Sequence, residues 1–221
     1  MTLPADHYRM KKRDLSLQEL LADGIVHALA LLAGVIAFPV LLVHTLQTAG
    51  IGTFAALTVY AAGFFLMWGF SLAYNMTPPS ALKWLLRRFD HSMIYVMIAG
   101  TYTAVIPHLH SPAWAWTLGV VVWTGAALGI LVKVVLPGRY DRLSILAYVL
   151  LGWVGVIAIG PVSTALPAMS LWLLAAGGLT YVAGIAFHVW ERLRFQNAIW
   201  HGFVLAGAAC HYAVIYRLAI P

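Results

Sequence analysis

Hydrophobic residues occupy long stretches of this chain, and short polar segments separate them. A helix needs about 20 predominantly apolar residues to cross a hydrocarbon layer roughly 30 Å thick, and several stretches reach that length. They do not alternate every second residue, as the strands of a membrane barrel do, so the pattern predicts helices. The separating segments contain proline, glycine or charge, as loops do. Seven spans follow, at residues 24–46, 53–75, 91–107, 113–136, 143–161, 168–190 and 198–219.

The composition agrees with a protein that lives in lipid. The chain is 62% hydrophobic and 9% charged, whereas about a quarter of the residues of a soluble domain are charged. We therefore predict an all-α integral membrane bundle that forms a single domain over residues 1–221. Residues 1–23 are polar and too charged for a secretory signal, so we expect a cytoplasmic N-terminal segment that precedes the first span.

Basic residues predict the orientation of the bundle. Twelve of the thirteen Lys and Arg residues fall before the first span or in or beside every second loop, and only Arg217 falls on the other side. By the positive-inside rule, the N-terminus is cytoplasmic and the C-terminus lies outside. The net charge of +6 then reflects topology and anionic lipid headgroups, not a nucleic-acid partner. We expect membrane lipids as partners, and a homo-oligomer is left open.

Polar residues gather at the predicted cytoplasmic ends of several spans. The segment FQNAIWHGFVLAGAACH (195–211) places Asn197 and His201 four residues apart in an otherwise apolar helix. Residues at this spacing project from one helix face, and polar groups in hydrocarbon are costly unless they face the bundle interior. We therefore predict one polar cluster at the cytoplasmic level. Its members are Asp23, His27, Ser71, Asn75, Asp90, His91, Asn197 and His201. The alternative is that each is an isolated structural group, with Asp90 paired to Arg87 or Arg88.

Three segments resemble a known family. RRFDHSMIYVMIAGTYTAVI (87–106) and NAIWHGFVLAGAACHYAVIY (197–216) resemble the hemolysin III branch of the progestin and adipoQ receptor superfamily. ELLADGIVHALALLAG (19–34) is similar to a looser form of the first-span motif. The resemblance covers nearly the whole chain. It implies seven spans, an inner N-terminus and, for this branch, a multi-pass protein of the bacterial inner membrane.

The resemblance also implies a zinc site, and this sequence departs from it. The family's ligand pattern falls on Ser71, Asp90 and His201, but Asn75 and Asn197 stand where the family has histidines. A neutral amide is a poor zinc ligand, and Asp90 with His201 alone would leave the ion under-coordinated. We therefore predict no cofactor, with zinc at Asp90 and His201 as the alternative.

Three functions remain open at this stage. The favoured one is a role in membrane-lipid homeostasis or sensing, with pore formation as a variant, because this class needs only a polar cluster. The second is a zinc-dependent, ceramidase-like lipid-amide hydrolase, in which Asp90 would accept a proton, Ser71 orient water and His201 bind metal. The third is a pH-responsive protein. Its titrating groups would be His27, His91, His188, His201 and His211.

Overall fold

The structure is a computed structural model that describes residues 15–220, so the basic residues Arg9, Lys11, Lys12 and Arg13 lie outside it. Every regular element in the described chain is helical. The elements are α1 (Leu17–Thr48), α2 (Ile51–Met76), α3 (Ala81–Val105), η1 (Ile106–His108), α4 (Pro112–Val135), α5 (Asp141–Gly152), η2 (Val154–Ala158), α6 (Ile159–Ala165), α7 (Ala168–Val189) and α8 (Gln196–Ala219).

Capping residues explain why the first and third helices begin before their predicted spans. Ser16 forms a capping box with Glu19, so α1 starts at Leu17 and includes part of the segment predicted to precede the span. The Ser80 hydroxyl accepts a hydrogen bond from Lys83 N, so α3 starts ten residues before the predicted boundary at 91. Hydropathy detects the lipid-crossing part of a helix and misses its polar extension.

The predicted fifth span is interrupted. Residues 143–161 were expected to form one helix, but the chain changes from α5 to the 3-10 turn η2 and then to α6. Gly152 and Gly155 weaken the helix at this point. Tyr102 of α3 compensates, since its hydroxyl donates to Gly152 O at 2.8 Å and accepts from Gly155 N at 2.8 Å. Broken backbone is tolerated at membrane depth only where such partners exist.

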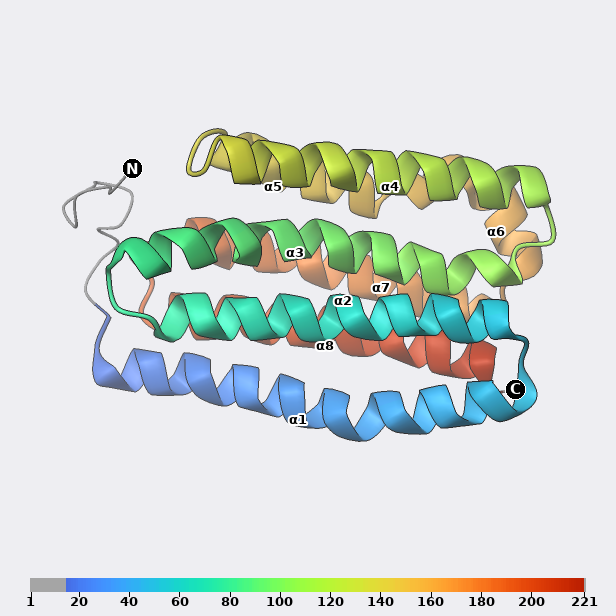
Figure 1. Cartoon of the computed structure of the whole chain (residues 1–221), viewed down its shortest axis with the longest axis horizontal. Coiled ribbons are helices and arrows are strands. Elements are labelled where there is room, and N and C mark those ends of the chain that lie inside the picture. The colour runs from blue at the N-terminus through green and yellow to red at the C-terminus, as the bar shows by residue number, and fades with distance from the viewer. Residues whose placement is uncertain (1–14, 221) are drawn as a thin grey trace.

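The long helices lie side by side in a bundle (Figure 1). α1 contacts α2 and α8, α3 contacts α2 and α4, and α7 contacts α8. Within residues 15–220, six helical segments, with α5 to α6 counted as one, are long and apolar enough to cross a membrane. α3 is not among them because its first half is charged and polar, although it runs beside α2 in the same bundle.

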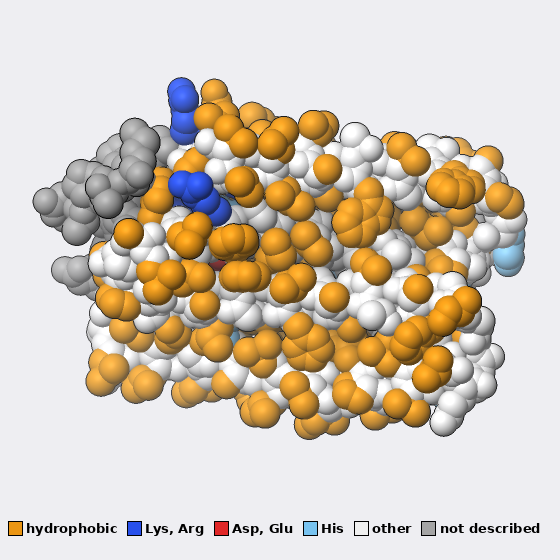
Figure 2. Space-filling model, in the orientation of Figure 1, with side chains coloured by type: hydrophobic (Ala, Val, Ile, Leu, Met, Phe, Trp, Pro, Cys, Tyr) orange, Lys and Arg blue, Asp and Glu red, His pale blue; other side chains and the backbone are white. Residues whose placement is uncertain are grey.

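The outer surface of the bundle is apolar. Figure 2 shows hydrophobic side chains along the whole length of the visible face, with Lys and Arg gathered toward one end. On α1 alone, Leu29, Leu32, Val35 and Ile36 are each more than half exposed. Such a surface is stable only in lipid. The prediction of an all-helical membrane bundle is confirmed.

The interior of the bundle between α1, α2 and α8 is filled by aromatic rings. Phe38 contacts Tyr60 and Phe64, with ring centroids 5.4 Å and 5.1 Å away. Trp68, which is 1% exposed, continues this column toward the end of α2. The column ends against a group of polar side chains, and it fixes the depth at which they lie.

Candidate functional site

The polar group lies where α1 and α8 begin and α2 ends. Asp23 and His27 come from the second and third turns of α1, Ser71 from the last turns of α2, and His201 from the second turn of α8. All four side chains are buried. These three helices are mutually adjacent only in the folded bundle, since Asp23 and His201 are 178 residues apart in the chain.

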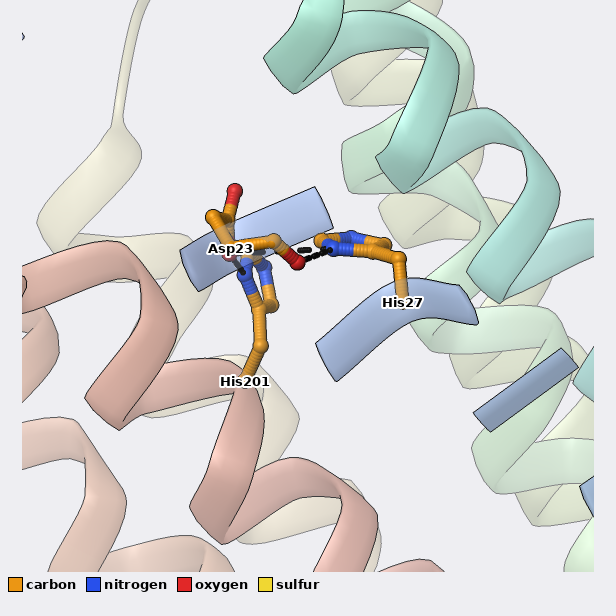
Figure 3. Close-up of side chains that lie close together, drawn as sticks. All are labelled: Asp23, His27 and His201. Carbon is orange, nitrogen blue, oxygen red and sulfur yellow. Dashed lines mark hydrogen bonds and ion pairs between the residues drawn. The ribbon is translucent and has the colours of Figure 1, made fainter. Parts of the chain in front are cut away.

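The Asp23 carboxylate faces both imidazole rings (Figure 3). Its Oδ1 atom is 2.5 Å from His201 Nδ1 and 3.7 Å from His27 Nδ1. His27 Nδ1 also lies 2.8 Å from the main-chain oxygen of Asp23. The opposite ring nitrogens converge on Ser71 Oγ, at 3.1 Å from His27 Nε2 and 3.4 Å from His201 Nε2. Asp23, His27, Ser71 and His201 thus form a closed ring of polar contacts, which we call the inner polar site.

The two asparagines extend the inner polar site toward the end of α2. Asn75 Nδ2 donates to Ser71 O at 2.9 Å and to Ser71 Oγ at 3.3 Å. Asn197 Nδ2 donates to Asn75 Oδ1 at 3.4 Å. Six of the eight residues of the predicted cluster are therefore linked by hydrogen bonds or close ring contacts.

The other two residues of the predicted cluster, Asp90 and His91, lie together on α3. Asp90 Oδ2 is 3.8 Å from His91 Nε2, and the His91 main-chain oxygen accepts a hydrogen bond from Tyr148 OH at 2.8 Å. Asp90 is not a member of the one group of metal-ligating side chains found in the described chain, which consists of Asp23, His27 and His201.

Trp68 forms the apolar floor of the inner polar site. Its ring meets that of His27 edge-on at 5.2 Å, and the two imidazole rings meet edge-on at 4.4 Å. Trp68 was not among the predicted site residues, because a tryptophan in an apolar span is typical of ordinary packing. Its spacing of three residues from Ser71 is the one signal that places it on the same helix face.

Contacts at the start of α1 hold it against the start of α8. Glu19 Oε1 accepts a hydrogen bond from Phe195 N at 3.0 Å, and Arg194 Nη2 donates to Gln18 Oε1 at 2.8 Å. Phe195 has a φ of 59°, a left-handed conformation that is uncommon for a bulky residue. These contacts lie one turn before Asp23 and bring it within reach of His201.

One oxygen of Asp23 is left without a partner. The carboxylate is 1% exposed, and its Oδ2 atom has no hydrogen-bond partner among residues 15–220. A buried carboxylate oxygen without a donor is expensive. The site can therefore bind a cation or a hydrogen-bond donor at this oxygen.

A second ionic cluster joins α3, α4 and α5 at the same end of the bundle. Asp141 Oδ2 accepts from Arg87 Nη2 at 2.7 Å, and Asp141 Oδ1 accepts from Lys133 Nζ at 3.0 Å. Lys133 is 2% exposed and Asp141 is 38% exposed. Each carboxylate oxygen of Asp141 has a cationic partner, so we call this set the paired ionic cluster.

Long helices with an apolar outer surface and a buried polar site define a multi-pass helical membrane protein. Residues 17–212 match the family model described as Haemolysin-III related. The chain belongs to this family, which confirms the resemblance of its sequence motifs.

The similar proteins support this assignment over almost the whole chain. Hemolysin-3 of Bacillus cereus is 34% identical over 215 residues, which are 96% of this chain and 97% of the relative. A Hemolysin-3 homolog of Bacillus subtilis (strain 168) is 30% identical over 93% of this chain and 98% of its own length. The human monocyte to macrophage differentiation factor is 27% identical over 58% of this chain and 53% of its own length.

Proposed function

We propose that this protein takes part in membrane-lipid homeostasis or sensing, and that its inner polar site binds a polar lipid group from the cytoplasmic side. The observation that carries the proposal is the buried ring of contacts among Asp23, His27, Ser71 and His201. Polar groups in hydrocarbon are costly and are usually functional. Side chains from three separate helices form this ring. The alternative, in which each polar residue is an isolated structural group, explains their meeting less well.

The topology that goes with this proposal has seven spans in a single domain over residues 1–221. α3 is the added span, because it lies beside α2 and α4 and is 25 residues long. The N-terminus would be cytoplasmic, as the gathering of basic residues at one end supports. The bacterial relatives support the inner membrane as the location.

Aromatic packing favours binding over conduction. The column of Phe38, Tyr60, Phe64 and Trp68 fills the bundle directly beyond the inner polar site, and all four rings are buried. An ion path through one chain would have to cross this column. Liposomes containing the purified protein should therefore stay tight, and proton or potassium leakage that depends on the protein would favour the pore-forming variant.

Lipid retention tests the main proposal. The protein is purified in mild detergent, and its bound lipids are identified by mass spectrometry. We expect a retained lipid class that His201→Gln loses. His211→Gln is the matched control, since His211 is partly buried on the same helix but contacts Leu174 O and not the inner polar site. Equal lipid retention by both variants would contradict the proposal.

Hydrolysis of a lipid amide or ester is the second candidate, and one observation favours it. Asp23 Oδ1 faces His201 Nδ1, and His201 Nε2 faces Ser71 Oγ at 3.4 Å. This order of carboxylate, imidazole and hydroxyl is the one that activates a serine nucleophile. Asp90, expected as the proton acceptor, would have no part in this relay.

Turnover of a fluorescent ceramide or phospholipid tests this second candidate. Ser71→Ala and His201→Gln should each lower the rate by about 100-fold or more, because each removes a member of the relay. Asp90→Asn should leave the rate within about threefold. A rate that falls strongly with Asp90→Asn would replace this assignment with the one that the family pattern implies, in which Asp90 accepts the proton.

A further inference from the structure

We propose that Asp23, His27 and His201 bind one divalent transition-metal ion, with zinc as the best match, in the interior of the bundle. This ligand set differs from the one that the family pattern implies. Two of the three residues come from α1, and only His201 is shared. The inference stands independently of the proposed lipid function.

The family's own ligand set does not fit this chain. Asn75 and Asn197 occupy the two positions where the pattern has histidines, and their amides hydrogen bond to each other at 3.4 Å. Asn75 also donates to Ser71. Both amide groups are engaged in hydrogen bonds, and an amide nitrogen has no lone pair to donate to a metal, so neither side chain offers a nitrogen ligand.

Three other side chains, those of Asp23, His27 and His201, provide atoms that can bind a metal ion. One ligand atom from each of Asp23, His27 and His201 lies within 4.8 Å of the other two. All three residues are buried, so they are not a chance group on an acidic surface. Two imidazoles and one carboxylate form a set that catalytic zinc sites use, with the fourth position open to water.

The unpartnered oxygen of Asp23 is the independent sign that a cation belongs here. Asp23 Oδ2 has no hydrogen-bond partner in the described chain, although the carboxylate is 1% exposed. Its other oxygen, Oδ1, faces His201 Nδ1 at 2.5 Å and His27 Nδ1 at 3.7 Å, so the acidic side chain lies among nitrogen ligand atoms in the bundle interior. A divalent ion at this position would compensate the charge and also engage the second oxygen.

The surroundings of the rings match those of ligating histidines. A metal-bound histidine usually donates its other N–H group to an oxygen, which fixes the ring orientation. When both Nδ1 atoms face the ion, both Nε2–H groups point at Ser71 Oγ, which lies 3.1 Å and 3.4 Å away. The contact between His27 Nδ1 and the Asp23 main-chain oxygen is the one that metal binding would break.

Metal binding requires a small rearrangement of the site, in which Asp23 Oδ1 and His201 Nδ1, now 2.5 Å apart, separate to admit the ion. In a tetrahedral zinc site the ligand atoms are about 3.3 Å apart, as bond lengths near 2.0 Å require. The ligand atoms here are within 4.8 Å of one another, so side-chain rotations that move them by about 1 Å complete the geometry. Nitrogen and carboxylate ligands in a set of this size favour zinc over magnesium and calcium, which prefer all-oxygen sites.

Metal content and a cobalt spectrum test the inference. The full chain is purified in detergent, treated with a chelator, and titrated with Zn²⁺ or Co²⁺. We expect one equivalent of zinc per chain, together with visible d–d absorption typical of low-coordinate Co²⁺. His27→Gln and Asp23→Asn should each weaken zinc binding by about tenfold or more, because each replaces a ligand with a neutral amide.

His211→Gln and Asp90→Asn serve as controls that should bind zinc as the unaltered protein does. Circular dichroism of each variant shows whether weaker zinc binding results from the missing ligand or from misfolding. If His27→Gln misfolds, the near-isosteric Asp23→Asn still tests the inference. Less than a tenth of an equivalent of zinc in the folded, unaltered protein would overturn the inference. Zinc that is lost with Asp90→Asn but kept with Asp23→Asn and His27→Gln would overturn it too.

The metal and the lipid proposals fail separately. Zinc binding without lipid retention leaves the metal site standing, and lipid retention without zinc leaves the lipid proposal standing. The metal also excludes the serine relay, since a His201 whose Nδ1 is ligated has a proton on Nε2 and cannot accept one from Ser71. A chelator should therefore have no adverse effect on hydrolysis if the relay operates.

Discussion

Two groups of charged and titratable side chains lie at the same end of the bundle, and they are satisfied to different degrees. In the paired ionic cluster, Asp141 has a cation on each oxygen. In the inner polar site, Asp23 has one oxygen that faces imidazoles and one that has no hydrogen-bond partner in the part of the chain that the structure describes. The first carboxylate is 38% exposed and the second is 1% exposed. Asp141 thus has more cationic partners than Asp23, although solvent already stabilises its negative charge.

The difference separates a structural role from a binding role. The paired ionic cluster joins α3, α4 and α5 and is complete without any ligand. The inner polar site joins α1, α2 and α8 and leaves Asp23 Oδ2 without a hydrogen-bond partner among residues 15–220, and in our proposal a cation or a donor completes it. Deep burial of an incomplete group is expected where a protein binds something, because stability alone would select an apolar or fully paired interior.

Asp141→Ala should have the largest effect on stability. It leaves Lys133 buried without its carboxylate partner, so we expect the free energy of unfolding to fall by about 2 to 3 kcal/mol, less than for a fully buried pair because solvent screens Asp141. Unfolding of the chelator-treated protein in mixed detergent measures this. Asp23→Ala should cost about 1 kcal/mol or less, since it also removes a buried charge. A larger loss for Asp23→Ala would reverse the roles of the two groups.

Zinc should stabilise the protein through the inner polar site only. At a zinc concentration 100 times the Kd, a ligand that binds only the folded state adds about 2.7 kcal/mol of stability. The rise in Tm should be at most about half as large in Asp23→Ala and should persist in full in Asp141→Ala, although the second variant is less stable throughout. An equal rise in all three proteins would indicate zinc bound elsewhere.

The double change Asn75→His with Asn197→His should add the ligands that the family pattern implies. The two amides already lie 3.4 Å apart, so imidazoles at these positions could share an ion with His201 or Asp90. We expect zinc affinity to rise by about tenfold, or about 1.4 kcal/mol, as measured by competition with a chromogenic chelator. If the double variant binds zinc no better, then the match of these positions to the family pattern is wrong.

Lys133→Met should have the smallest effect. Asp141 keeps Arg87 as a partner, and removing a buried ammonium also removes its desolvation cost. We expect a change of about 1 kcal/mol or less in the free energy of unfolding, in either direction, and no change in zinc content. A loss as large as that of Asp141→Ala would show that Lys133, and not Arg87, is the partner on which Asp141 depends.

Sequence reasoning predicted the kind of fold well, and its helix limits less well. Apolar stretches predicted a helix at the place of each long helix, since hydropathy depends on local composition alone. The N-terminal half of α3 was missed because it is helical but charged, and the break at Gly152 and Gly155 was missed because apolar residues continue through it. At both places hydropathy misplaced the helix limits, because a residue can be helical without contacting lipid and can contact lipid without being helical.

The structure links six of the eight residues of the predicted polar cluster, through pairings that the sequence did not indicate. Asp23 and His27 were expected in the polar cluster but were given no role as ligands, and Asp90 was favoured in their place. The spacing of Asp23 and His27 placed them on one face of α1, but it could not indicate that this face turns toward α8. The contacts of Glu19 with Phe195 and of Gln18 with Arg194 decide that packing.

The amino-acid sequence by itself determined that this protein is a helical membrane bundle with polar residues near the ends of its helices, because burial in lipid requires long apolar segments whatever their partners are. Only the tertiary structure decided which polar residues meet. Asp23 and His201 lie on the first and the last helix, and no local pattern specifies the distance between two helices that pack side by side. That packing, and not the family's motif positions, places a carboxylate with an unpartnered oxygen between two imidazoles.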